Sequence, residues 1–228
     1  MHSSLFIVSL LSIAVSCIAF PFPSPLPNDA VPPPSDVKIL VKDVKLQGSG
    51  CPATTGHASL DADGISMSVI FDKFSVQLGP NSQQVDTYKT CILKVPIEFP
   101  TGFTFGMFEA TERGHVQLDA GVLGNIHNEL YQTGERACSV FDKPLIGEDG
   151  YNEDYFLQLD KASTGYFLCP KKGSTARNII TFYVKTSLNL QYDPKKPRVQ
   201  GDTRTGLVTL DSTDTHYETE YHLQWKKC

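Results

Sequence analysis

Apolar and polar residues alternate with a period of two along most of the chain from Val37 onward. The clearest run covers residues 91–99, where an apolar side chain occupies every odd position and Lys94, Pro96 and Glu98 lie between them. Such alternation indicates a β-strand with one face in a core and the other in solvent. Because Pro96 has no N–H for a ladder hydrogen bond, we expect this strand to lie at a sheet edge or to carry a bulge.

Other segments show the same period. The two clearest run over residues 180–191 and 217–225, and shorter candidates cover 39–46, 65–78 with a kink near Asp72, 103–108, 115–123, 126–131, 155–159 and 207–210. Turn-forming pairs such as Gly79-Pro80 and Asp193-Pro194 separate them. Many short strands without a 3.6-residue helical period predict an all-β protein, a single-domain antiparallel β-sandwich with disulfides.

The first 19 residues predict a signal peptide. An apolar run from Leu5 to Phe20 passes through small residues and meets a proline-rich stretch, and it is shorter than the ~20 residues that a membrane span needs. We expect cleavage near Ala19, a disordered proline-rich lead-in over residues 20–36 and the β-sandwich domain over residues 37–228. An extracellular, secreted protein without a stable membrane span follows, with an uncleaved anchor as the open alternative.

The net charge bears on possible partners. The chain carries a formal charge of -5, and the leader contains no Asp, Glu, Lys or Arg, so the mature protein keeps this balance. A general nucleic-acid binder has a basic surface. The composition therefore argues against nucleic acid as a partner.

Cysteines recur at wide intervals up to the last residue. Six are present, and loss of Cys17 with the leader leaves five, none of them in a CxxC pair. In an extracellular setting the simplest account is two disulfides and one remaining thiol. Spacing alone leaves the pairing open.

Several short motifs occur together in this chain: GSGCP at 48–52, FDKF at 71–74, KTC at 89–91, PTGF at 100–103, RGH at 113–115, LDAGV at 118–122 and QWKKC at 224–228. As a set they resemble the secreted, largely fungal family catalogued as domain of unknown function 4360. The resemblance spans about Gly48 to Cys228 and implies a secreted, disulfide-bonded β protein without an assigned activity. Its usual cysteines correspond to Cys51, Cys91, Cys169 and Cys228. Cys138 departs from the pattern and is the candidate free thiol, and the acidic segment 142–154 departs from it too.

The last candidate strand places Glu218, Glu220 and His222 on one face if the alternation holds. Positions two apart in a strand lie ~7 Å from each other, so a Glu and a His there could share a metal ion only with bent side chains. We expect a solvated polar face and no metal site, and keep these three residues as a possible binding surface.

Two further places carry polar or aromatic side chains suited to binding. Asp119 lies in the LDAG motif, where we expect a hydrogen-bonded turn residue rather than a catalytic carboxylate. Tyr151 lies in the acidic segment and Tyr155 directly follows it, and rings and oxygens together there could hold a sugar or a partner protein. The alternative is that the aromatic residues of this segment cover the core.

The sequence lacks the GxSxG, HExxH, Walker and GxGxxG motifs. We therefore expect no catalytic residues, no metal and no cofactor. The leading hypothesis is a non-catalytic protein that binds at the cell surface, cell wall or host interface, with cell-wall polysaccharide or a surface protein as partner. The alternatives are a carbohydrate-active hydrolase or lyase with paired carboxylates, and a secreted effector or toxin.

Overall fold

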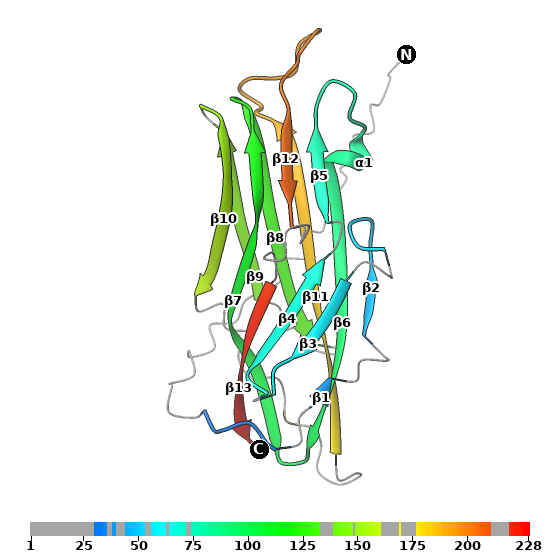
Figure 1. The fold of residues 1–228 in the computed structure, drawn as a ribbon, viewed down its shortest axis with the longest axis vertical. Helices are drawn as coiled ribbons and strands as arrows, with labels where there is room; N and C mark the ends of the chain where they lie inside the picture. Colours follow the sequence, from blue (N-terminus) through cyan, green and yellow to red (C-terminus); the bar gives the residue numbers. More distant parts are fainter. Residues whose placement is uncertain are drawn as a thin grey trace, which may run out of the picture.

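A computed structural model describes residues 30–35, 38–39, 44–52, 56–62, 64–71, 74–132, 139–147, 149–160, 169, 177–210 and 219–228. Two antiparallel sheets pack face to face (Figure 1). Sheet I contains β1 (Lys38–Ile39), β2 (Lys45–Gln47), β6 (Tyr88–Pro100), β11 (Arg177–Tyr192), β8 (Val122–Gln132) and β9 (Ser139–Gly147). Sheet II contains β3 (Gly56–Leu60), β4 (Ser66–Phe71), β13 (Thr219–Lys227), β7 (Phe103–Leu118), β12 (Gly206–Thr209), β5 (Ser75–Leu78) and β10 (Tyr151–Asp160). The predicted all-β class, an antiparallel sandwich with disulfides, is confirmed.

Residues 91–99 form a strand with one face in the core, as their alternation predicts. Leu93, Val95, Ile97 and Phe99 are buried between the sheets. β6 pairs with β11 along its whole length, and on its other side β1 ends opposite Ile97 while β2 begins opposite Lys94. Among the described residues, Pro96 has no strand beside it on that side, which is the local edge that proline requires.

Sheet II branches along β7. One edge of β7 pairs with β10 over residues 109–118, while its other edge pairs with β13 over 103–112 and then with β12 over 115–118. β5 lies beyond β12, and β4 and β3 lie beyond β13, so the sheet has an upper and a lower half in Figure 1. Gly114 lies at the branch, where a Cβ would stand 2.1 Å from the Thr209 carbonyl oxygen and 2.4 Å from Tyr155 Oη. The branch therefore requires glycine at this position.

Aromatic side chains fill the lower half of the core. The ring of Trp225 lies 5.3 Å from that of Phe99 and 5.1 Å from that of Phe105, between centroids. Its indole Nε1 donates a hydrogen bond to the Gly64 carbonyl oxygen at 2.9 Å. This bond satisfies the single polar atom of a fully buried tryptophan side chain.

The lead-in contacts the domain at Val31. Val31 donates a backbone hydrogen bond to the Trp225 carbonyl oxygen at 2.8 Å and packs against the core. The expectation of a lead-in without packed structure over 20–36 is therefore wrong at Val31, because a sheet edge there accepts a backbone partner. The expected signal peptide over 1–19 lies outside the described residues.

Two disulfides tie the ends of the domain. Cys51 bonds Cys91 across 40 residues, and Cys169 bonds Cys228 across 59 residues. Closing loops of this length stabilises the fold by about 4 kcal/mol per bridge in the chain-entropy model. Cys138, the candidate free thiol, lies outside the described residues.

Several predicted strand boundaries are corrected. Residues 65–78 form two strands, β4 and β5, which pair with different partners in the two halves of sheet II. The candidate strand 103–108 and the first part of the candidate 115–123 belong to one long strand, β7, which continues through residues 109–114. The candidate 115–123 is itself divided by a turn at residues 119–121, after which Val122 begins β8.

Candidate functional site

The outer face of sheet I gathers polar side chains from three neighbouring strands. Along β8 the inward positions include Ile126, Asn128 and Leu130, which are buried, so the residues that alternate with them point outward. The strand register then places His127 beside Ser187 and Glu129 beside Lys185. On the next strand out, β9, Asp142 lies opposite His127.

A continuous chain of hydrogen bonds links these side chains. Asp142 Oδ1 lies 3.1 Å from Asn125 Nδ2 and 2.7 Å from His127 Nδ1. His127 Nε2 lies 3.0 Å from Glu129 Oε1, and Lys185 Nζ donates to the same oxygen at 2.8 Å. Each member thereby fixes the position of the next, which preorganises the face before any ligand arrives.

The ionisable members of this chain favour each other's charged forms. Partial burial lowers the pKa of His127, but its hydrogen bonds to Asp142 and Glu129 outweigh burial and raise this pKa above its ordinary value. The hydrogen bond to Glu129 raises the pKa of Lys185, and the hydrogen bond from His127 lowers the pKa of Asp142. Burial raises the pKa of Glu129, but the bonds from Lys185 and His127 outweigh it and lower this pKa.

A cleft of about 270 Å³ lies in this face. The cleft is lined by seven residues: Tyr88, Asn125, His127, Glu129, Lys185, Ser187 and Asn189. Asp142, the remaining member of the hydrogen-bond chain, is not among them. Ser187 is only 5% exposed, and its Oγ has no hydrogen-bond partner among the described residues. Ser187 therefore lines the cleft, but its hydroxyl is itself shielded from solvent.

An aromatic pair extends the face beyond the cleft. Tyr131 and Tyr183 are cross-strand neighbours whose rings stack with centroids 5.0 Å apart and an angle of 6° between planes. Tyr88, at the other end, is 49% exposed. Rings at both ends and hydrogen-bonding groups between them form a surface suited to polar ligands with apolar patches.

The residue types on one rung, Asp142, His127 and Ser187, are those of a nucleophilic triad. Their geometry is different, since His127 Nε2 contacts Glu129 and no described hydrogen bond joins His127 to Ser187. Activation of a serine nucleophile requires that bond. The described contacts of these three residues therefore do not form a nucleophile and its base.

The binding residues proposed from the sequence lie at separate places in the structure. Asp119 lies in the turn between β7 and β8, where its Oδ2 accepts hydrogen bonds from Thr205 N at 2.6 Å and Thr205 Oγ1 at 2.9 Å. Glu220 and His222 lie on the outer face of β13, with 3.7 Å between Glu220 Oε1 and His222 Nε2. Glu218 lies outside the described residues. Asp119, Glu220 and His222 do not belong to the cleft on sheet I.

Tyr155 is corrected as a candidate for an exposed binding surface. It is 6% exposed and points into the core over Gly114, where its Oη donates to the Thr209 carbonyl oxygen at 3.3 Å. Tyr151 is half-buried and packs against the core. The alternative interpretation, in which aromatic residues of this segment cover the core, describes both residues.

The cleft residues were missed because each looks like an ordinary outward position of a strand. The alternation of polar residues at 125, 127 and 129 was the available signal, and it indicates only a solvated face. Long-range pairing of β8 with β9 and β11 is what turns these positions into one cluster.

Within the described ranges, no group of three or more His, Cys, Asp or Glu side chains could hold a metal ion. Nor do those ranges contain a helix long and apolar enough to cross a membrane.

A known relative bears on the localisation of this protein. The chain is 28% identical over 197 residues to an "Uncharacterized secreted protein" of Arthroderma benhamiae, covering 86% of this chain and 74% of that protein. This relative confirms the prediction of a secreted, extracellular fungal protein, and the disulfides agree with it.

Two solved structures show weak likeness. One is TmCBM61 in complex with beta-1,4-galactotriose, with a TM-score of 0.22, 13% identity and coverage of 89% of this chain and 97% of that one. The other is the GH31 alpha-xylosidase from Xanthomonas citri, with a TM-score of 0.17, 12% identity and coverage of 88% and 20%. TM-scores this low do not support a shared fold. A family model described as domain of unknown function (DUF4360) matches residues 37–228, and the chain therefore belongs to this family.

Proposed function

We propose that the protein is a non-catalytic extracellular binding protein, and that the cleft on sheet I binds polysaccharide at a cell surface, cell wall or host interface. The observation that carries the proposal is that Asn125, His127, Glu129 and Lys185, which line the cleft, form one preorganised cluster of hydrogen-bonding groups. Sugar hydroxyl groups can donate to the carboxylate oxygens of this cluster and accept from its amide and ammonium groups.

The charge of the cluster favours a neutral ligand. Asp142 and Glu129 contribute two negative charges, and Lys185 and protonated His127 contribute two positive charges, so the sum is zero. Each charged group already contacts one of opposite sign. A polyanion or polycation would have to break these pairs, whereas a sugar can bond to their remaining donors and acceptors.

The shape of the surface fits an extended polymer. Tyr88 at one end and the stacked Tyr131 and Tyr183 at the other offer rings on which sugar faces pack. Asn125 and Asn189 lie side by side within the cleft and add amide donors and acceptors. Rigid groups of this kind lose little conformational entropy on binding.

The test is a pull-down of the oxidised mature protein on insoluble chitin, glucan and mannan. We expect retention on at least one polymer, and an Asn125→Ala/Asn189→Ala variant that is largely released from it. Gln224→Ala, an exposed amide on sheet II, is the matched control and should bind as the wild type does. Failure of the wild type to bind every polymer contradicts the proposal.

The same samples separate binding from hydrolysis. A non-catalytic protein leaves the polymers intact, so no reducing ends accumulate over time. Release of reducing ends that is lost on replacing Glu129 or Asp142 would instead favour a hydrolase with paired carboxylates.

A further inference from the structure

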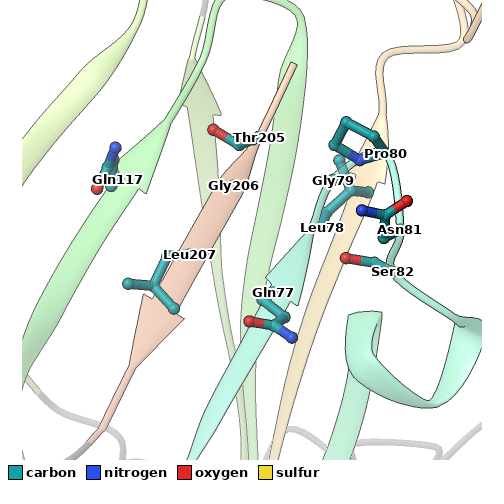
Figure 2. Close-up of a pocket in the computed structure, with 10 residues that line it drawn as sticks. All are labelled: Gln77, Leu78, Gly79, Pro80, Asn81, Ser82, Gln117, Thr205, Gly206 and Leu207. Carbon is teal, nitrogen blue, oxygen red and sulfur yellow. The ribbon is translucent and has the colours of Figure 1, made fainter. Parts of the chain in front are cut away.

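A second concavity lies on the opposite side of the sandwich, on the outer face of sheet II. It has a volume of about 390 Å³ and lies over β12, between β5 and the upper end of β7 (Figure 2). The segment after β5 forms one rim through Asn81 and Ser82. This groove shares no residue with the cleft on sheet I.

The groove is built around a leucine with an amide on each side. The strand register pairs Leu207 with Gln77 on β5 and with Gln117 on β7, so the three side chains stand in one row on the outer face. Figure 2 shows Gln77 and Gln117 on either side of Leu207. Both glutamines are exposed. An amide has two donors and an acceptor with two lone pairs, so this row can bond to neighbouring hydroxyl groups.

The lining of the groove carries no charged side chain. Two groups of opposite charge lie beside the groove and outside its lining: Asp119 accepts two hydrogen bonds from Thr205, and Arg198 donates to the Pro80 carbonyl oxygen at 2.9 Å. Within the lining itself, a phosphate, a carboxylate or a metal ion would find no side chain of opposite charge. The ligand that fits is uncharged and rich in hydrogen-bonding groups.

The backbone of the groove floor is not available for strand addition. All four residues of β12 pair with β5 on one side and with β7 on the other. A peptide that binds by adding a strand needs a free sheet edge, which β12 does not offer. Recognition at the floor over β12 therefore uses side chains, and the leucine gives the apolar floor on which the C–H face of a sugar ring packs.

We propose that this groove is a second carbohydrate site, which takes an uncharged sugar chain on the sheet opposite the candidate cleft. It goes beyond the function proposed above, since it rests on a different set of residues. With both sites occupied, one molecule would hold two chains on opposite faces.

The test uses side-chain amide signals as reporters at both places. Heteronuclear NMR spectra of the oxidised mature protein are recorded with soluble laminarihexaose, mannohexaose and chitohexaose, up to about 10 mM, a range that suits weak sugar binding. We expect saturable shifts of the Gln77 and Gln117 signals with at least one of them. If these signals do not move with any of the three, the groove is not a carbohydrate site.

The pattern of shifts distinguishes the two proposals. Shifts confined to Asn125 and Asn189 would overturn the groove proposal and leave the cleft on sheet I standing. Shifts confined to Gln77 and Gln117 would support the groove proposal and overturn the proposal that the cleft on sheet I binds sugar.

Variants complete the test. Gln77→Ala/Gln117→Ala should bind the active oligosaccharide at least about tenfold more weakly, because two sets of hydrogen bonds are lost. Gln224→Ala, an exposed amide of the same sheet outside the groove, should bind as the wild type does. Equal affinities of the double variant and the wild type would overturn the proposal, and unfolding temperatures measured on all three confirm that the fold is intact.

Discussion

Asn128 donates a hydrogen bond from Nδ2 to Glu112 Oε2 across the interior of the sandwich, at a distance of 2.8 Å. Thr186 Oγ1 donates in turn to Asn128 Oδ1 at 2.6 Å, so a polar chain joins β7 of sheet II to β8 and β11 of sheet I. Glu112 is 1% exposed, and its Oε1 has no partner among the described residues. Burial raises its pKa to about 7, although the bond from Asn128 acts in the opposite direction.

The buried carboxyl group of Glu112 leads us to expect that the free energy of unfolding falls as pH rises. Its folded-state pKa of about 7 lies above the value of 4.5 for a free glutamate, so the folded state binds the proton more tightly. Its contribution is fully present below about pH 4.5 and is lost as pH rises through about 7, a difference of about 3 kcal/mol. Tyr155 and Tyr221 face this carboxyl and stay protonated over this range, because burial raises their pKa values.

The measurement is urea unfolding of the wild type and Glu112→Gln across this range of pH. The variant should gain stability relative to the wild type as pH rises, since glutamine keeps the acceptor for Asn128 and carries no charge. Glu109→Gln, on the outer face of the same strand, is the control and should show no such trend. A difference between Glu112→Gln and wild type that is independent of pH contradicts the prediction.

Ser187→Ala separates binding from folding. Removing a buried hydroxyl that has no partner should leave the free energy of unfolding unchanged or raise it by up to about 1 kcal/mol. The same change should leave polysaccharide retention unchanged, because the hydroxyl is shielded from solvent and lies out of reach of a ligand in the cleft. Unfolding temperature and pull-down are measured on one preparation. A destabilised variant would show that the hydroxyl serves the fold, and a stable variant that loses retention would show that the ligand reaches it.

His127 predicts binding that weakens at higher pH. An imidazole ring donates from both nitrogens only when protonated, and both nitrogens of His127 contact carboxylates. Its raised pKa keeps this doubly donating form to a higher pH than usual, and above that pKa one of the two bonds loses its proton. We expect retention on the polymer to fall severalfold between about pH 6 and about pH 8.

Titration of the His127 ring signals by NMR checks the direction of the shift, and His127→Gln should remove most of the pH dependence of binding. His115→Gln, on the opposite sheet, should leave it unchanged. A midpoint for His127 below that of a free histidine would refute this account of the cluster.

Gly114→Ala should destabilise the protein by about 3 kcal/mol or more. The new methyl group would meet the Thr209 carbonyl oxygen at 2.1 Å, and this atom belongs to a paired strand that cannot move away cheaply. Gly79→Ala is the matched control, because its Cβ would make ordinary contacts at 3.5 Å or beyond. Chemical unfolding of both variants gives the comparison, and equal losses would argue against a strict glycine requirement at the branch.

The sequence by itself determined the class of the fold and much of its local structure. Alternation at 91–99 is a local property of the chain, because successive side chains of a strand point to opposite faces wherever that strand lies. The same reasoning works for 180–191, which is the central part of β11. Resemblance to a known family singled out the four cysteines that the structure joins in pairs.

Only the tertiary structure decided which strands are neighbours. β7 was divided into two candidates because Glu112 puts a carboxyl at an inward position, where the apolar pattern fails. Tyr155 looked available for binding, and only the missing side chain of Gly114 on the paired strand explains why it is buried.

The candidate cleft also depends on which strands are neighbours. His127, Asp142 and Ser187 lie on three strands, and their register makes them neighbours. Side-chain alternation is set within a few residues, whereas register is set by packing between segments far apart in the chain, and one sequence read locally does not contain it.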